Sequence, residues 1–265
     1  MKIEGKTIWV TGASSGIGRA IAIELAKSGG RLILSARSRE GLQSTQKVCL
    51  QYTEMAEVVV MDVASESSIM EAWKQVQETV DVVDILINNS GISQRATAAS
   101  TTMAVARQIM EVNYFGAIQL SKLVLPGMLR QRSGYIVVTG SLSGKFGWKQ
   151  RSSYAASKFA LQGYYESLRA ETADQQVQVM MVIPGRIKTD ISLHSVTADG
   201  TQNQKMDKAQ EGGIPADVCA RKVVKGIIAD KKEIIISGFE RLMITIRFLA
   251  PWLYYRIAAK RDPNI

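Results

Sequence analysis

Histidine, cysteine and proline are scarce in this chain of 265 residues. The single histidine, His194, excludes a histidine-rich metal site and leaves little material for a histidine-based catalytic triad. Cys49 and Cys219 have neither metal-ligand spacing nor a partner motif, so we expect reduced thiols and no bound metal. The five prolines are scattered, and no repeat, linker or low-complexity tract interrupts the chain. We therefore expect one domain over residues 1–265.

Long apolar runs and clusters of one charge sign are also missing. The amino terminus, MKIEGKTIWV, has no apolar core of signal-peptide type, and no run of about 18 apolar residues follows. We expect a cytoplasmic protein without a transmembrane span. The net charge is +9, but the basic residues are dispersed among acidic ones. This pattern predicts attraction for anionic ligands and no nucleic-acid partner.

Short β-branched or apolar runs alternate with longer segments of helical period. Strands are expected at Thr7–Thr11, Arg31–Ser35, Glu57–Met61, Val83–Asn88, Gly134–Thr139, Val177–Ile183 and Glu233–Ile236. Helices are expected at Ser15–Ser28, Arg39–Leu50, Glu66–Thr79, Thr102–Arg130, Ser152–Thr172 and Ala216–Ala229. The alternation predicts an α/β fold, a Rossmann-type doubly wound parallel sheet of about seven strands with helices on both faces.

Two segments depart from this alternation. Residues 186–213 are polar, poor in β-branched residues and end in Gly212-Gly213, which predicts a lid over a substrate. Residues 238–265 form a basic amphipathic extension. Its apolar stripe is Leu242, Ile246, Leu249, Leu253 and Ile257, and its basic residues are Arg241, Arg247, Arg256, Lys260 and Arg261.

Two interpretations of the extension stay open. It can be a helix that packs on its own domain or on a second subunit. It can also lie on an anionic membrane surface as a peripheral contact, with aromatic side chains at the interface. Those aromatic residues are Phe248, Trp252, Tyr254 and Tyr255.

A glycine-rich stretch, Thr11–Gly18, stands between the first expected strand and the first expected helix. Glycines permit a tight turn and let a phosphate approach the backbone, and the helix amino terminus offers free N–H groups. In this position the stretch predicts a dinucleotide site. The residues expected to bind the cofactor here are Gly12, Ser14, Ser15, Gly16, Ile17 and Gly18.

The end of the second strand indicates which dinucleotide binds. NAD enzymes usually carry an acidic residue there for the ribose 2′-hydroxyl, but this chain has Ala36 followed by Arg37 and Arg39. A guanidinium group would pair with a 2′-phosphate. We expect NADP(H) to be preferred over NAD(H), with Arg37 as a binding residue; the alternative is that both arginines are solvated loop charges.

Tyr154 and Lys158 stand four residues apart in an expected helix and so share one face. A neighbouring ammonium group favours the phenolate and makes the phenol a usable acid and base. Ser141 follows the preceding strand and is placed to hydrogen-bond a substrate oxygen, with Ser143 as its rival in the same turn. Ordinary turn chemistry is the alternative role for either serine.

In these motifs the chain resembles the short-chain dehydrogenase/reductase family over nearly its whole length. The motifs occur in the family's order: Thr11–Gly18, Asp62, Asn88–Gly91, Asn113, Ser141, Tyr154 with Lys158, and Pro184-Gly185. Ser90 stands where the family often has alanine. The basic extension resembles the branch of 11β-hydroxysteroid dehydrogenases and dehydrogenase/reductase member 7-like reductases, and we expect the chain to lack their amino-terminal anchor.

The resemblance implies roles for individual residues. Ser141 would orient the carbonyl, Tyr154 would donate or accept the proton, Lys158 would hold the nicotinamide ribose, and Asn113 would anchor a relay water. Asp62 would bind the adenine, and Thr189 the nicotinamide carboxamide. The implied cofactor-binding set also includes Val63, Asn89, Ser90, Gly91, Tyr154, Lys158, Pro184, Gly185 and Ile187. The family further implies a homodimer or homotetramer.

The expected activity is NADP(H)-dependent interconversion of a ketone or aldehyde with an alcohol, on a small and fairly apolar substrate. Two alternatives remain open. One is reduction of a 3-oxoacyl thioester, which the positive charge favours and the basic extension disfavours. The other is a non-catalytic module that senses NADP(H).

Overall fold

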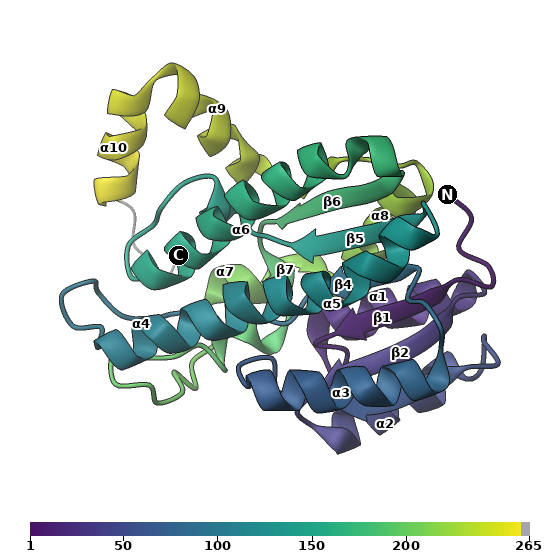
Figure 1. Cartoon of the computed structure of the whole chain (residues 1–265). Coiled ribbons are helices and arrows are strands. Elements are labelled where there is room, and N and C mark those ends of the chain that lie inside the picture. Colours follow the sequence, from purple (N-terminus) through teal and green to yellow (C-terminus); the bar gives the residue numbers. More distant parts are fainter. Residues whose placement is uncertain (261–265) are drawn as a thin grey trace.

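The computed structural model describes residues 1–260, without the side chains of residues 208 and 209. A parallel seven-stranded sheet has the order β3-β2-β1-β4-β5-β6-β9 (Figure 1). Its strands are β1 (Thr7–Thr11), β2 (Arg31–Ala36), β3 (Ala56–Val60), β4 (Ile85–Asn88), β5 (Gly134–Thr139), β6 (Val177–Pro184) and β9 (Glu233–Ile236). The predicted doubly wound sheet is confirmed, with strand ends shifted by one or two residues in β2, β3, β4 and β6.

Helices cover both faces of the sheet, because alternate residues of each strand enter one of two apolar cores. One core receives α1 (Gly16–Lys27), α2 (Arg39–Cys49) and α8 (Ala216–Ile228). The other receives α3 (Glu66–Thr79), α5 (Gly116–Arg130) and α6 (Ser152–Glu171). Trp9 and Val10 of β1 show the alternation, since they are fully buried in opposite cores.

The order in which strands are added to the sheet reverses at β1: β2 and β3 lie on one side of it, and β4 and the later strands lie on the other. Strand β2 pairs with β1 on one side and β4 pairs with it on the other. The loops after β1 and β4 therefore separate at the carboxyl edge, where doubly wound sheets bind their ligands. The functional residues should gather at this edge.

The helix expected at Thr102–Arg130 is interrupted. It consists of α4 (Met103–Met110), a π-helical turn (Glu111–Phe115) and α5. A π turn inserts one extra residue and changes the direction of the side chains that follow it, and such turns are frequent at functional sites. Asn113 lies in this turn and is 1% exposed.

The 186–213 segment contains only short elements. They are β7 (Ile187–Lys188), a 3-10 turn (Asp190–Ser192) and α7 (Lys208–Glu211), and β7 pairs with β8 (Ile214–Pro215). Val196 forms bridges with Gln94 and Gln202. The segment is thus attached to the stretch that follows β4.

The extension after β9 contains two helices, α9 (Leu242–Leu249) and α10 (Pro251–Lys260), which project from one end of the molecule (Figure 1). The break comes at Ala250, because a proline disfavours helical backbone in the residue before it. The expected stripe is packed only in part: Ile246 and Ile257 pack against the core, whereas Leu242 and Leu249 are exposed. The buried residues of the extension, Met243 and Tyr254, lie outside the stripe. Arg261 and the rest of 261–265 lie outside the described residues.

The packed side of the extension contacts the loop before α6. The Tyr254 ring lies 6.1 Å from that of Phe146, and its hydroxyl donates to the Gly147 carbonyl. The outward side carries large apolar groups, of which Phe248 is 84% exposed. Within residues 1–260, none of the helices has the length and apolar character needed to cross a membrane.

Candidate active site

The turn after β1 requires glycine at three positions. Gly12 and Gly16 have φ values of +64° and +54°, a region that other residues rarely adopt. A Cβ on Gly18 would lie 2.2 Å from the Gly12 carbonyl oxygen, so a side chain there would clash with the backbone. Gly18 thus lets α1 pack closely on the turn, and it is not among the residues that line the cavity described below.

Helix α1 begins at Gly16 with Ser15 as its N-cap residue. Within the described chain, the Ser15 side chain makes no capping hydrogen bond, so the first N–H groups of the helix remain available. The amino end of a helix also carries a partial positive charge. These N–H groups can therefore bind phosphate oxygens.

Hydrogen bonds fix the loop after β4 against β1 and β5. The Thr11 hydroxyl accepts from the N–H of Asn89 at 3.0 Å and of Ser90 at 3.1 Å. Asn89 Nδ2 donates to the Thr11 carbonyl at 3.3 Å, and its Oδ1 accepts from the Thr139 hydroxyl at 3.2 Å. Asn89 therefore connects three adjacent strand ends.

Tyr154 and Lys158 lie in the first turns of α6 and are 8% and 5% exposed. The Lys158 ammonium donates to the Thr139 carbonyl at 2.8 Å and lies 5.9 Å from the centre of the Tyr154 ring. Ser141 Oγ accepts from the Ser143 N–H at 3.1 Å. Of the two serines, Ser141 lines the cavity and Ser143 does not. Ser141 is therefore the better candidate for a hydrogen bond with the substrate oxygen.

Burial has opposite effects on the two groups. It raises the pKa of the Tyr154 phenol, and a hydrogen bond with Ser141 and the guanidinium groups of Arg151 and Arg95 lower it in part. Burial also lowers the pKa of Lys158 from 10.5 to about 8. Both shifts have the same cause, since a low-dielectric environment disfavours phenolate and ammonium alike.

Asn113 acts on the loop after β4 without lining the cavity. Its Oδ1 accepts from the Ile92 N–H at 2.8 Å, and its Nδ2 donates to the Ile92 carbonyl at 3.0 Å and to Ser157 Oγ at 2.9 Å. A Cβ on Gly91 would lie 3.2 Å from Asn113 Oδ1 and 3.6 Å from Lys158 Nζ. The side chain thus holds the loop close to Lys158.

A cavity of about 590 Å³ runs along the carboxyl edge of the sheet. Of the predicted site residues, those that line it are Gly12, Ser14, Ser15, Gly16, Ile17, Arg37, Asp62, Val63, Asn89, Ser90, Gly91, Ser141, Tyr154, Lys158, Pro184, Gly185, Ile187 and Thr189. The Asp62 carboxylate is held by the Ala64 N–H at 3.0 Å. Residues far apart in the sequence thus share one continuous space.

Other lining residues were not singled out from the sequence. They include Ser38, Gly41, Ile92, Val112, Gln202 and Gln210. Ser38 could have been found, because it precedes the helix expected at Arg39 and its side chain caps α2. Gln202 and Gln210 carry no local signal, since the path of the 186–213 segment brings them to the cavity.

Comparison with known proteins assigns the chain and its fold to a family. The family profile described as short chain dehydrogenase matches residues 6–199. The chain belongs to this family. As a short-chain dehydrogenase it is an oxidoreductase that acts with a nicotinamide dinucleotide on alcohol or carbonyl groups.

Curated relatives define the branch. The chain is 38% identical to a Drosophila melanogaster "Dehydrogenase/reductase SDR family protein 7-like", covering 98% of this chain and 81% of that protein. It is 36% identical to the Mus musculus "Dehydrogenase/reductase SDR family member 7B", covering 98% and 82%. This short-chain dehydrogenase therefore belongs to the member 7-like branch, as its resemblance implied.

Solved structures agree with the fold. A short-chain dehydrogenase from Streptomyces avermitilis superposes with a TM-score of 0.84 at 25% identity, covering 99% of this chain and 100% of that one. A second, from Burkholderia phymatum in complex with NAD, has a TM-score of 0.85 at 21% identity, covering 100% and 98%. The second likeness concerns the fold alone.

Proposed function

We propose that the protein is an NADP(H)-dependent oxidoreductase that interconverts a ketone or aldehyde with an alcohol, with Tyr154 as proton donor and acceptor. The observation that carries the proposal is the cavity itself. Ser141, Tyr154 and Lys158 line one part of it, and the glycine-rich turn and Arg37 line another. One elongated ligand can therefore contact both parts.

The residues present fit a dinucleotide. Gly12 and Gly16 allow a phosphate to approach the start of α1, where N–H groups are available. A larger residue could not replace Gly18 without displacing the Gly12 carbonyl. Asp62 and Thr189 line the cavity, which supports their proposed roles in binding the adenine and the nicotinamide carboxamide.

When bound, the nicotinamide ring would supply or accept the hydride. The Ser141 hydroxyl then hydrogen-bonds the substrate oxygen and keeps it next to the Tyr154 phenol. In reduction Tyr154 donates its proton to that oxygen, and in oxidation it takes the proton from the alcohol. Lys158 holds positive charge nearby, and Asn113 keeps the Ile92 backbone in place.

The preference for NADP(H) rests on Arg37. Strand β2 ends at Ala36, and Arg37 and Ser38 follow it on the cavity wall. A guanidinium group pairs well with a phosphate monoester, whereas an acidic residue here would repel it. Arg39 does not line the cavity, which leaves Arg37 as the residue for the 2′-phosphate.

The substrate part of the cavity favours an apolar compound with one polar group. Ile92 and Ile191 are apolar residues of the cavity wall, which Ser141 and Tyr154 also line. Apolar walls with a few placed polar groups are typical of small-molecule sites. Lipid-derived ketones and hydroxysteroid-like alcohols have this character.

The proposal extends to assembly and location. Phe115 and Phe159 are 49% and 40% exposed on the α5 and α6 side of the molecule, which favours a homodimer or homotetramer through these helices. The outward apolar side of α9 and α10, with its arginines, favours peripheral contact with an anionic membrane. The buried free thiols of Cys49 and Cys219 fit a reducing compartment such as the cytoplasm.

The test is NADPH oxidation with a panel of ketones, keto-steroids and 3-oxoacyl thioesters, repeated with NADH. Tyr154→Phe should lower kcat by about 10²- to 10⁴-fold, the usual contribution of a general acid. Tyr164→Phe is the matched control, because Tyr164 belongs to the same helix but not to the cavity wall. Full activity in Tyr154→Phe would overturn the catalytic assignment. Tight NADPH binding without turnover on any substrate would favour the sensing module.

A further inference from the structure

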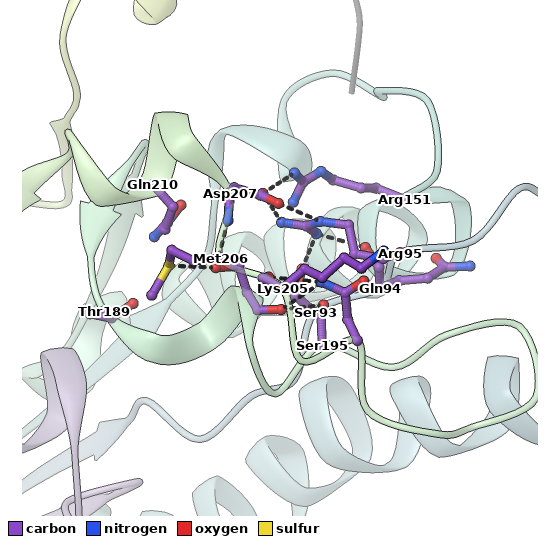
Figure 2. Close-up of polar contacts among 12 residues, drawn as sticks. Ser93, Gln94, Arg95, Arg151, Thr189, Ser195, Lys205, Met206, Asp207 and Gln210 are labelled. Carbon is purple, nitrogen blue, oxygen red and sulfur yellow. Dashed lines mark hydrogen bonds and ion pairs between the residues drawn. The ribbon is translucent and has the colours of Figure 1, made fainter. Parts of the chain in front are cut away.

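Three ionised side chains from three separate segments meet beside the catalytic helix (Figure 2). Arg95 follows β4, Arg151 directly precedes α6, and Asp207 belongs to the 186–213 segment. The Asp207 carboxylate accepts from Arg95 Nε at 3.2 Å and also from Arg95 Nη2, and it accepts from Arg151 Nη2 at 3.2 Å. The side chains are only 5%, 20% and 10% exposed, in the same order. Two guanidinium groups and one carboxylate leave a net charge of about +1.

The cluster is attached to the start of α6. Arg95 Nη1 donates to Ser93 Oγ at 3.2 Å and to the Gln94 carbonyl at 2.7 Å. Gln94 is fully buried, and its Oε1 accepts from the N–H groups of Ser153 at 2.9 Å and Tyr154 at 3.2 Å. Gln94 therefore supplies the helix cap that the N-cap residue Arg151 does not provide within the described chain. Movement of the 93–95 stretch would displace Tyr154.

The cluster is also attached to the 186–213 segment, which lines part of the cavity. The Val196 N–H donates to the Ser93 carbonyl at 2.9 Å, and the Arg95 N–H donates to the Val196 carbonyl at 2.8 Å. The Asp207 N–H donates to Ser192 Oγ at 3.3 Å. His194 and Gln202, between these contacts, line the cavity. Asp207 thus fastens the far end of this segment to the catalytic helix.

Charged and titratable groups reach the surroundings of Tyr154 from three elements. They are Arg151 and Lys158 from α6 and its start, Arg95 from the stretch after β4, and Asp207 with the cavity-lining Asp190 and His194 from the 186–213 segment. The guanidinium groups keep their charge throughout the working pH range. Lys158 does not, because burial lowers its pKa to about 8. Arg151 and Arg95 are therefore the constant positive charges near the phenol, and both lower its pKa.

We propose that Arg95, Arg151 and Asp207 are positioning residues: the guanidinium groups set the electrostatic environment of the Tyr154 hydroxyl, and Asp207 links that environment to the position of the 186–213 segment. The inference rests on the proposed role of Tyr154 as acid and base. With Asp207 seated, its carboxylate offsets one guanidinium charge, while burial raises the pKa of Tyr154 and keeps the proton available for donation. When Asp207 leaves with the segment, the positive charge rises and release of the proton is favoured.

The test is a ¹⁹F NMR titration of the full chain labelled with 3-fluorotyrosine, in which Tyr154→Phe assigns the Tyr154 signal. Arg151→Gln removes a positive charge and should raise the pKa of Tyr154, by on the order of one pH unit. Asp207→Asn removes the negative charge and keeps the side chain nearly the same size, so it should lower the pKa of Tyr154. Arg151→Lys retains the charge and should restore a value close to that of the wild type.

Amide hydrogen exchange gives a second readout for Asp207. Asp207→Asn should accelerate exchange at Val196 and Asn203, whose N–H groups are bonded within or next to this segment. Arg151→Lys should accelerate it much less. Unchanged exchange in Asp207→Asn would overturn the part assigned to the segment.

A remote ion pair provides the control. Lys6 and Asp84 pair at 3.0 Å near the opposite edge of the sheet, and Asp84 is 18% exposed. Asp84→Asn should leave the Tyr154 titration unchanged whatever it costs in stability. Shifts of the same sign in Arg151→Gln and Asp207→Asn, or no shift in either, would overturn the inference. Because the titration needs no substrate, opposite shifts in an inactive protein would instead count against the proposed function alone.

Discussion

The cofactor side and the substrate side of the cavity are built by different means. On the cofactor side, the turn after β1 supplies six lining or supporting positions within one short stretch, Gly12–Gly18, and glycine backbone and N–H groups form the site. On the substrate side, Arg95 meets Asp207 across 112 positions and Arg151 meets it across 56. These side-chain ion pairs supplement the backbone hydrogen bonds of Val196 with Ser93 and Arg95.

The difference has a physical consequence. A turn made by adjacent residues is determined by local sterics, so a single methyl group can destroy it. A cluster joined by long-range ion pairs depends on the whole fold, and its pairs can separate while the sheet remains intact. The cofactor side should therefore respond to substitutions in an all-or-none way and the substrate side in a graded way.

Gly18→Ala should cause the largest loss of cofactor binding and stability among the substitutions on the cofactor side. Its Cβ would lie 2.2 Å from the Gly12 carbonyl oxygen, so either the turn or α1 must move. We expect NADPH binding to be lost and the free energy of unfolding to fall by about 1–3 kcal/mol, as for other overpacked sites. NADPH fluorescence titration and urea unfolding measure the two effects.

Gly163→Ala is the matched control for that substitution. Gly163 lies inside α6 and is exposed, and beyond the adjacent residues and the backbone of its own helix, a Cβ added there would meet nothing within 4 Å. Alanine should therefore stabilise the helix by about 0.5–1 kcal/mol and leave NADPH binding unchanged. Equal loss of NADPH binding in Gly18→Ala and Gly163→Ala would show that the steric clash in the turn is not what determines cofactor binding.

Arg37→Ala tests the one charged contact expected on the cofactor side. Loss of a charge-assisted hydrogen bond of about 1.5–3 kcal/mol should weaken NADPH binding by roughly 10- to 100-fold. Affinity for NADH should stay the same, because NADH has no 2′-phosphate. Arg39→Ala is the control, since Arg39 does not line the cavity. Equal affinity of the wild type for NADPH and NADH would already contradict the assignment.

The contrast between the two sides explains what could be predicted from the sequence. Strand β5 and helix α3 begin and end where their periodicity indicates, because their burial follows a regular pattern. The Thr11–Gly18 turn could be recognised because glycines at fixed spacing between a strand and a helix have few structural alternatives. These features depend on neighbours in the sequence.

Other features depend on packing and carry no such signal. The π turn at Glu111–Phe115 interrupts a helix whose apolar spacing looks continuous. The buried face of the carboxyl-terminal extension includes Ile246 and Ile257 of the predicted stripe, but it is centred on the contact of Tyr254 with Phe146. Gln94 could not be identified as the cap of α6, because 59 positions separate it from Ser153.

Asn113 lies between the two sides, and its replacement should reduce stability and activity by an intermediate amount. Asn113→Ala leaves the Ile92 N–H without its side-chain acceptor, and an unsatisfied buried group costs about 1–3 kcal/mol. We expect lower stability in urea and a lower kcat as the loop shifts near Lys158. Ser157→Ala is the milder partner, since it removes one of the two acceptors of Asn113 Nδ2. A larger loss in Ser157→Ala than in Asn113→Ala would contradict this order.

Lys158 stands where the two sides meet and should give the smallest of these effects, a change in stability that depends on pH. Its pKa is about 8 in the folded protein and 10.5 ordinarily, so between these values the unfolded chain binds more protons and stability rises with pH. Below pH 8 both states are protonated and the burial cost is fully present. Lys158→Met removes this cost but also leaves the Thr139 carbonyl without its Lys158 donor, so the two effects partly cancel. At roughly 2–4 °C per kcal/mol for a chain of this size, we expect Tm at pH 7 to rise by a few degrees. The gain should shrink from pH 8 upward; a gain independent of pH would show that the buried charge is not its source.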